Sequence, residues 1–240
     1  MSYLEDNGYF DFDDLRSSDY GVWINGGGTY NAAKRQYKSI QVPGRNGTLT
    51  IDNGAYEEVD HTYTAFIAEE LGFNIEDFRN ALLSKPGYKI LTDSYHPDEF
   101  YRAKIMDGLA VSVAPAAAGG AFTLTFKRDP RRFLKAGEFI HKPADGGVVA
   151  NPTQFNSKPT IKVTGYGDLT INNEVITIAN AYSYVVIDSE LMDCYYGSTN
   201  ANGAVTFNSG KFPELHPGNN GISYDNTITA VEITPHWWVL

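Results

Sequence analysis

Turn residues divide the segment between Lys38 and Ile67 into pieces so short that it can fold only as antiparallel β-structure. Glycine and asparagine supply the positive φ angles that tight turns require, and Pro43 fixes the direction in which the chain enters the first turn. The expected strands are Ser39–Val42, Thr48–Ile51 and Val59–Ile67, and the turns between them are Pro43–Gly47 and Asp52–Gly54. We therefore predict a three-stranded β-meander. The segment contains no evident catalytic residues, so we expect it to form a surface.

The rest of the first half predicts one helix lying on a sheet. Asn74 stands in an N-cap position, with an acidic residue three positions later. Ile75, Phe78 and Leu82 share one face at helical spacing, and Lys85-Pro86-Gly87 ends the pattern. These signals predict an amphipathic helix at about residues 74–84 in an α+β N-terminal domain of a mainly β protein.

The second half carries short strands separated by glycine or asparagine turns, with no helix signal. The expected strands are Thr160–Val163, Leu169–Ile171, Val175–Ile178, Tyr184–Asp188 and Ala230–Thr234. Strands at this spacing are typical of a β-sandwich or jelly roll. We therefore predict two domains, residues 1–137 and residues 138–240.

The charge argues against nucleic acid as the main ligand. The chain has 19 Lys and Arg against 29 Asp and Glu, a formal charge of −10, whereas phosphate binding needs a net basic face. The basic run Lys127–Arg132 is short and interrupted by Asp129, so we interpret it as a solvated linker or interface patch rather than a phosphate site. Cys194 is alone, which excludes an intrachain disulfide and a cysteine-based zinc site. No apolar run approaches the roughly 20 residues of a membrane span.

No catalytic motif is visible. The five histidines are scattered without metal-ligand spacing, and there is no nucleophile elbow. The glycine run Gly26–Gly28 is not followed by the Lys-Ser/Thr of a phosphate loop, so it indicates a loop tip or a hinge. Carboxylates could pair as in glycoside hydrolysis, but the sequence nominates no pair. We expect no catalytic residue, no metal and no cofactor.

Aromatic residues of the second half leave a carbohydrate site open as an alternative. Four of them could stack on sugar rings: Tyr195, Tyr196, Trp237 and Trp238. The simpler interpretation is that Trp237 and Trp238, on opposite faces of a terminal strand, send one ring into the core and the other into an interface.

Several short motifs, in order and spacing, resemble the distal tail proteins of long-tailed bacteriophages. In the first half these are Leu15–Gly21, Gly28–Ala32, Val42–Gly47 and Asp52–Tyr56. In the second half they are Pro159–Gly165, Ile187–Glu190 with Met192, Phe212–Leu215, Pro217–Asn220 and Pro235–Trp237. The likeness runs nearly from end to end.

The resemblance implies a structural virion protein of the tail tip, made in the cytoplasm of the bacterial host. Such proteins assemble, usually as six copies, into a ring through which DNA passes. They contact the tail tube protein, the tape measure protein and the receptor-binding proteins of the tail tip, and no membrane. The resemblance also implies a galectin-like sandwich outside the ring, and it makes Pro43, Gly44, Arg45, Asn46 and Gly47 a candidate protein interface. The alternative is a carbohydrate-binding module that attaches the particle to the host cell wall.

Two physical expectations accompany the ring. Exposed strand edges of the N-terminal domain would be completed by a neighbouring copy, which closes the assembly at a fixed number. The early acidic residues Glu5, Asp6, Asp11, Asp13 and Asp14 would keep the channel repulsive to passing DNA.

Overall fold

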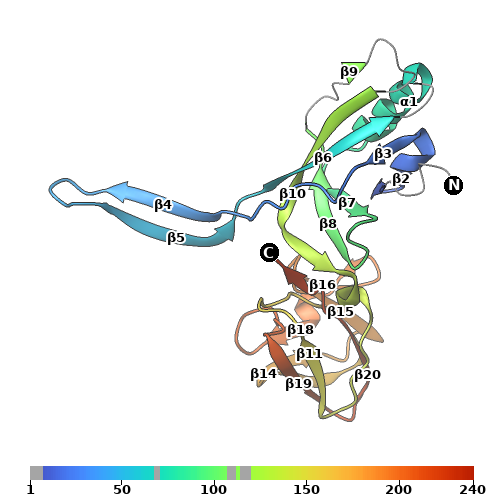
Figure 1. Ribbon diagram of the computed structural model, residues 1–240. Coiled ribbons are helices and arrows are strands. Elements are labelled where there is room, and N and C mark those ends of the chain that lie inside the picture. The colour runs from blue at the N-terminus through green and yellow to red at the C-terminus, as the bar shows by residue number, and fades with distance from the viewer. Residues whose placement is uncertain (1–7, 68–70, 107–111, 114–119) are drawn as a thin grey trace. The chain divides into compact units, whose positions relative to one another are not determined.

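The computed structural model describes residues 8–67, 71–106, 112–113 and 120–240, and the chain forms two compact units (Figure 1). The N-terminal unit comprises residues 1–132 with Leu240, and the C-terminal unit comprises residues 133–239. The sequence placed this division after Gly137. Strands dominate both units, which confirms the mainly β class.

One large sheet carries the core of the N-terminal unit. Its strands run in the order β2 (Leu15–Arg16), β1 (Phe10–Phe12), β7 (Lys89–Asp93), β8 (Glu99–Lys104), β10 (Gly120–Leu134), β6 (Val59–Ile67) and β3 (Val22–Ile24), with β9 (Ser112–Val113) beside β10. A 3₁₀ turn, η1 (Ser17–Tyr20), joins β2 to β3. In β6, every second residue from Val59 to Ile67 is buried, as expected of a strand with one face on a core.

Helix α1 (Leu71–Leu83) packs on this core. Phe78 and Leu82 are fully buried, and Ile75 packs partly buried beside them, so the expected apolar face is confirmed. Phe78 meets Phe10 of β1 edge to face, with ring centroids 6.3 Å apart. The expected N-cap is wrong, because the helix begins three residues earlier and places Asn74 inside it. The apolar face therefore located the helix better than the capping pattern did.

The expected meander is a hairpin instead. β4 (Arg35–Gln41) and β5 (Thr48–Tyr56) form a two-stranded sheet of their own (Figure 1). The expected turn at Asp52–Gly54 is wrong, because β5 runs through it with an irregular register. β6 leaves the hairpin and pairs with β3 and β10, because its alternating apolar residues are buried only in the main core.

The C-terminal unit is a sandwich of two five-stranded sheets. One has the order β11 (Gly147–Asn151), β19 (Gly218–Tyr224), β13 (Gly167–Ile171), β14 (Glu174–Ile178) and β18 (Val205–Phe207). The other has the order β17 (Thr199–Asn200), β16 (Asp193–Tyr196), β15 (Tyr184–Asp188), β12 (Thr160–Gly165) and β20 (Ile228–Thr234). Short 3₁₀ segments η2 (Lys135–Glu138) and η3 (Asn202–Ala204) complete the unit, and the terminal strand β21 (Trp238–Val239) pairs with β10.

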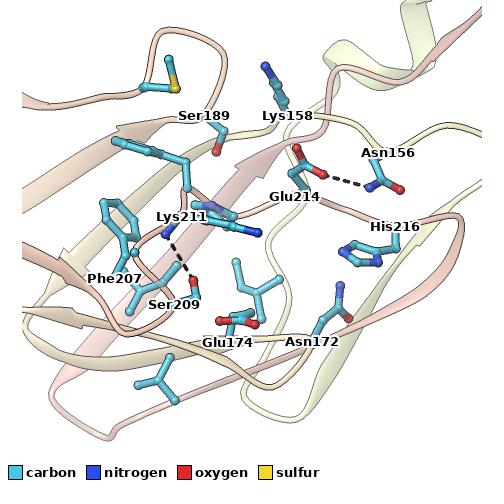
Figure 2. A pocket seen from close by; sticks show the side chains of 17 residues that line it. Asn156, Lys158, Asn172, Glu174, Ser189, Phe207, Ser209, Lys211, Glu214 and His216 are labelled. Atoms are coloured by element: carbon cyan, nitrogen blue, oxygen red, sulfur yellow. Dashed lines mark hydrogen bonds between the residues drawn. The ribbon is translucent and has the colours of Figure 1, made fainter. Parts of the chain in front are cut away.

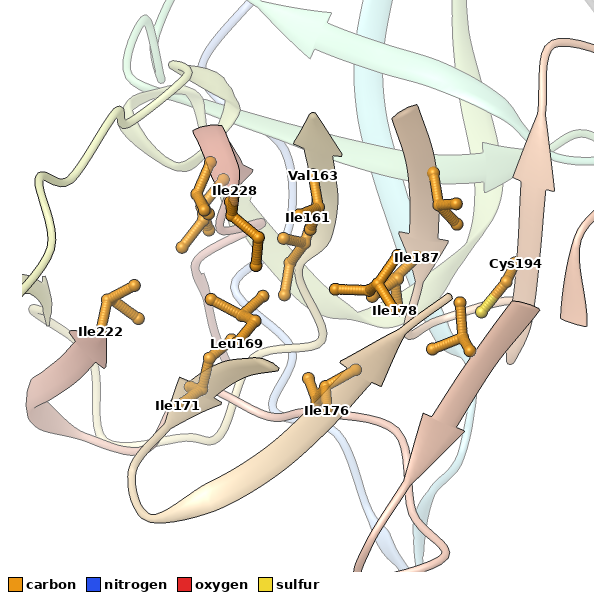
Figure 3. Close-up of a cluster of buried hydrophobic side chains, with 14 of the residues drawn as sticks. Ile161, Val163, Leu169, Ile171, Ile176, Ile178, Ile187, Cys194, Ile222 and Ile228 are labelled. Carbon is orange, nitrogen blue, oxygen red and sulfur yellow. The ribbon is translucent and has the colours of Figure 1, made fainter. Parts of the chain in front are cut away.

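Side chains from the two sheets meet in one apolar cluster (Figure 3). Leu169 and Ile176 come from one sheet, and Ile161 and Ile187 come from the other. The Cys194 thiol is also part of this cluster. All five strands expected here lie within observed strands of the sandwich.

Candidate functional site

The β4–β5 hairpin exposes an apolar face. In the register Lys38 lies opposite Ile51 and Ile40 lies opposite Leu49, so these side chains and Val42, just after β4, project from one face. Ile40, Val42, Leu49 and Ile51 are each between 37% and 44% exposed. The other face is mainly polar and carries Tyr37, Ser39, Gln41, Thr48, Thr50 and Asp52. A two-stranded ribbon cannot cover such a face by itself. The sequence reasoning missed it, although its alternation was visible.

An ion pair holds the base of this hairpin in register. Arg35 Nε lies 2.6 Å from Asp52 Oδ2, and Arg35 Nη1 donates to the Tyr56 hydroxyl at 3.0 Å. The Gly54 backbone N–H donates to Asp52 at 2.8 Å and, together with Arg35, lowers the pKa of that carboxyl. These contacts span the irregular section of β5.

The candidate interface Pro43–Gly47 forms the tip of the hairpin. Gly44 and Gly47 have φ angles of 80° and 83°, and the Arg45 N–H donates to the Val42 carbonyl at 3.2 Å. Every residue of the turn is exposed. The five residues are therefore accessible and adjoin the apolar face.

The C-terminal unit contains a pocket of about 700 Å³ (Figure 2). The rings of Phe207 and Phe212 line one part of it, with centroids 4.4 Å apart. Glu174 and Lys211 also line it, and neither side chain forms an ion pair within the described part of the chain. Pockets of this size with mixed aromatic and charged linings are typical of small-ligand sites.

One hydroxyl at this pocket lacks a partner. Ser189 is 2% exposed, and its Oγ has no hydrogen-bond partner among the described residues. A buried hydroxyl without a partner costs about 1–3 kcal/mol.

None of the four aromatic residues considered for sugar binding is among the residues that line this pocket. Trp237 is buried in the sandwich core at 2% exposed, so its ring faces are already covered. Trp238 stacks on Phe155 with centroids 4.3 Å apart, and Tyr196 packs partly buried against the core. Tyr195 is half-buried. The pocket residues escaped prediction because Phe207 and Phe212 lie in a segment without a regular pattern.

The basic run lies inside strand β10, so a solvated linker is wrong for this segment. Arg131 binds the Asp129 carboxylate through two nitrogens, at 2.8 and 2.9 Å. Arg128 is 4% exposed. Arg128 lies on the buried face of β10, where every second side chain points inward. The charge of the run suggested an exposed segment, so the sequence did not predict this burial.

A second, smaller pocket lies in the N-terminal unit, with a volume of about 220 Å³. His61, His96, Tyr101 and Arg128 are among the residues that line it. Burial, followed by the charge of Arg128, lowers the pKa of His61 to about 4, so the ring is neutral at pH 7. Within the part of the chain that the structure describes, neither ring nitrogen of His61 has a hydrogen-bond partner.

His96, which lines the same pocket, has a hydrogen-bond partner at each ring nitrogen. Asp93 accepts hydrogen bonds from the Tyr63 hydroxyl at 2.9 Å, from His96 Nδ1 at 3.0 Å and from the backbone N–H groups of Tyr95 and His96 at 2.9 Å each. His96 Nε2 lies in hydrogen-bond contact with the Tyr30 hydroxyl. In the described ranges no three His, Cys, Asp or Glu side chains are grouped so that they could hold a metal ion.

Three of the early acidic residues are ion-paired, and Glu5 and Asp6 lie outside the described residues. The pairs are Asp11 with Arg16, Asp13 with Lys89 and Asp14 with Lys85. Within the described residues, no helix is both long and apolar enough to cross a bilayer.

The chain has the fold of a phage hub protein. Over 97% of its length it superposes on 99% of the SPP1 Dit protein (gp 19.1), a hub of the adsorption apparatus in phages that infect Gram-positive bacteria, with a TM-score of 0.75 and 12% identity. A weaker likeness, with a TM-score of 0.48 and 11% identity, covers 95% of this chain and 97% of a chain in the activated baseplate of phage p2. No family model matches the sequence, and no curated protein matches it.

Proposed function

We propose that the protein is a non-catalytic structural component of a phage tail that forms a ring at the distal end of the tail tube. In this proposal about six copies enclose a channel for DNA, in line with cyclic assembly through repeated contacts. The ring joins the tube to the proteins that adsorb to the host. The exposed apolar face of the β4–β5 hairpin carries the proposal, in a chain that shares its fold with a phage hub protein.

The hairpin is suited to bind a neighbouring copy. About two fifths of the surface of each of its four apolar residues is exposed to water. Burying this exposed part would contribute about 1 kcal/mol for each residue. The outer edges of β4 and β5 are also unpaired in the described chain, so their backbone groups can accept another strand. The main sheet ends in the short strands β2 and β3, and Gly8 already bonds to the outer edge of β3. We therefore favour the hairpin, rather than the edge strands of the main sheet, as the contact with a neighbouring copy.

A matched pair of variants tests the hairpin. Ile40 and Leu49 lie opposite each other on the apolar face, and Ser39 and Thr50 lie opposite each other on the polar face. We expect Ile40→Asp/Leu49→Asp to remain monomeric in light scattering and to be missing from tails viewed by cryo-microscopy. Ser39→Asp/Thr50→Asp introduces the same charges at the same distance along the ribbon and should assemble like the wild type.

The result is decisive only if both variants unfold at the wild-type temperature. Equal assembly of the two variants would remove the hairpin from the interface. A wild-type chain that neither forms rings nor enters tails would contradict the whole proposal.

A second candidate function is glycan binding by the C-terminal pocket. It is favoured by the lining of the pocket, which includes Phe207, Phe212 and Ser189, whose hydroxyl has no partner among the described residues. Sugars offer both hydroxyl groups and an apolar ring face. The full chain should then be retained by purified Gram-positive cell walls. Glu174→Ala/Lys211→Ala should abolish retention, whereas Lys142→Ala/Glu232→Ala, an ion pair outside the pocket, should not. Failure of the wild type to bind would remove this candidate.

A further inference from the structure

Arg128 is a buried cation without a counter-ion. Among the described residues its guanidinium donates to two backbone carbonyls, those of Pro130 at 3.4 Å and Asn31 at 3.3 Å, and its Nε has no partner there. No carboxylate of the described chain pairs with it. It stacks on the Tyr101 ring, with its central carbon 5.1 Å from the ring centroid. A buried charge without a partner is strongly destabilising, so its position calls for a compensating group.

The nearby carboxylates cannot supply that compensation because other groups hold them. Both oxygens of Glu99 are bound by Arg132 Nη1, at 3.1 and 3.0 Å. Asp93 is saturated by Tyr63, Tyr95 and His96. The Leu240 oxygen, which lines the same pocket, is held by Arg132 at 2.8 and 3.1 Å. None of these groups pairs with Arg128 in the described chain.

Two further residues with donor groups line the same pocket. His61 is 3% exposed, and neither ring nitrogen has a hydrogen-bond partner among the described residues. One of the two carries a proton in the neutral ring. Tyr101 is 2% exposed, and burial raises the pKa of its hydroxyl, which keeps that group protonated. The pocket of about 220 Å³ lies against all three residues, and a water molecule takes up about 30 Å³ of liquid. It has room for a group of several heavy atoms.

We propose that this pocket binds one small oxyanion, a carboxylate or phosphate group, with Arg128 as its charge partner and His61 and Tyr101 as hydrogen-bond donors. Arginine suits this role because its planar fork matches the geometry of both groups. The ligand can be a free ion or the carboxylate of a side chain from a second copy. Either source would present the same oxyanion to Arg128. A free ion would fill the site in the monomer, whereas a side chain of a second copy would fill it only on assembly.

The test compares thermal unfolding of the full chain in chloride buffer and in ~50 mM phosphate at equal ionic strength, because a ligand of the native state raises its stability. We expect a saturable rise in the unfolding temperature of the wild type, and for Arg128→Met only the smaller, non-saturating rise that phosphate gives proteins in general. In chloride buffer Arg128→Met should unfold no earlier than the wild type, because the variant lacks the unpaired charge. Arg16→Met removes an exposed arginine of β2 that does not line the pocket and should respond to phosphate like the wild type.

A second readout follows the imidazole directly. Phosphate should shift the ¹⁵N signals of His61 saturably in the wild type and leave those of the exposed His216 in place. An undiminished phosphate response of Arg128→Met, or unmoved His61 signals, would overturn the proposal.

The source of the anion follows from repeating the titration on separated species. If monomer and assembled protein both bind phosphate, the ligand is a free ion. If only the monomer binds it, a carboxylate from a second copy fills the site on assembly. If neither binds phosphate or acetate, there is no such site.

Discussion

Gly28 lies flat against the ring of His61: a Cβ added to this glycine would come within 2.6 Å of His61 Nε2. The preceding residue is equally close to a second ring, because a Cβ on Gly27 would lie 2.3 Å from His96 Cε1. The glycine run thus covers two imidazoles of the N-terminal unit. The sequence indicated a loop tip or a hinge at Gly26–Gly28. In the structure, Gly27 and Gly28 are glycines because the rings of His96 and His61 occupy the space that a side chain would need.

Gly28→Ala should destabilise the protein by about 2–4 kcal/mol, because it combines a φ of +79° with the clash against His61. Gly26→Ala is the matched control, since Gly26 has a φ of +83° with no atom within 4 Å of the added Cβ, and should cost only about 1 kcal/mol. Urea denaturation of both variants measures the difference. Equal losses would show that contact with the imidazole contributes nothing.

Acid should weaken the N-terminal unit through His61. Its pKa is about 4 in the folded chain against 6.5 ordinarily, so below pH 6.5 the unfolded chain takes up a proton that the folded chain refuses. Stability is therefore complete above pH 6.5 and declines as the pH falls towards 4, by at most about 3 kcal/mol. His61→Gln should flatten this part of the profile in denaturation at a series of pH values.

Replacement of an exposed histidine is the control for this profile. His216→Gln should keep the wild-type slope between pH 6.5 and 4, because that side chain lies in water. If His61→Gln retains the full slope, the acid sensitivity originates elsewhere.

The Cys194 thiol should not react until the sandwich opens. It is fully buried, and burial raises its pKa to about 12, so almost no thiolate exists near neutral pH. Labelling with a disulfide reagent at pH 8 should be slower than in denaturant by at least about 1,000-fold, since it requires opening of the unit. Rapid labelling of the native protein would contradict the packing seen in Figure 3.

The turn between β13 and β14 allows a test of backbone conformation alone. Asn172 and Asn173 have φ angles of 52° and 73°, the conformation that two-residue hairpin turns favour. Asn173→Ala should cost about 1 kcal/mol, whereas Asn173→Gly should cost almost nothing because glycine adopts this conformation freely. Thermal unfolding of the two variants provides the comparison, and an equal loss for both would mean that side-chain contacts of Asn173 dominate.

Local pattern predicted the elements whose environment is local. The sandwich strands are bounded by turns such as Asn172-Asn173, and the apolar face of α1 is set by Phe78 and Leu82 at helical spacing. Local pattern failed where partners are distant in sequence. β6 pairs with β10, about 60 residues away, and nothing in the hairpin sequence indicates that preference.

The small pocket was beyond prediction for the same reason. His61, Tyr101 and Arg128 come from three strands, β6, β8 and β10, and only the sheet order brings them together. In the sequence, Arg128 belongs to a charged run that suggests solvent. The hairpin was half predicted: its turn was expected, but alternation usually indicates a buried face, and here that face is exposed.

The apolar face of the β4–β5 hairpin also affects the solubility of the purified protein. Because hydrophobic attraction strengthens with sulfate and with warming from the cold, concentrated stocks in such salts should turn cloudy sooner than dilute stocks kept cold. Recovery of soluble material would then depend on the order in which salt and protein are mixed, before any tail component is added.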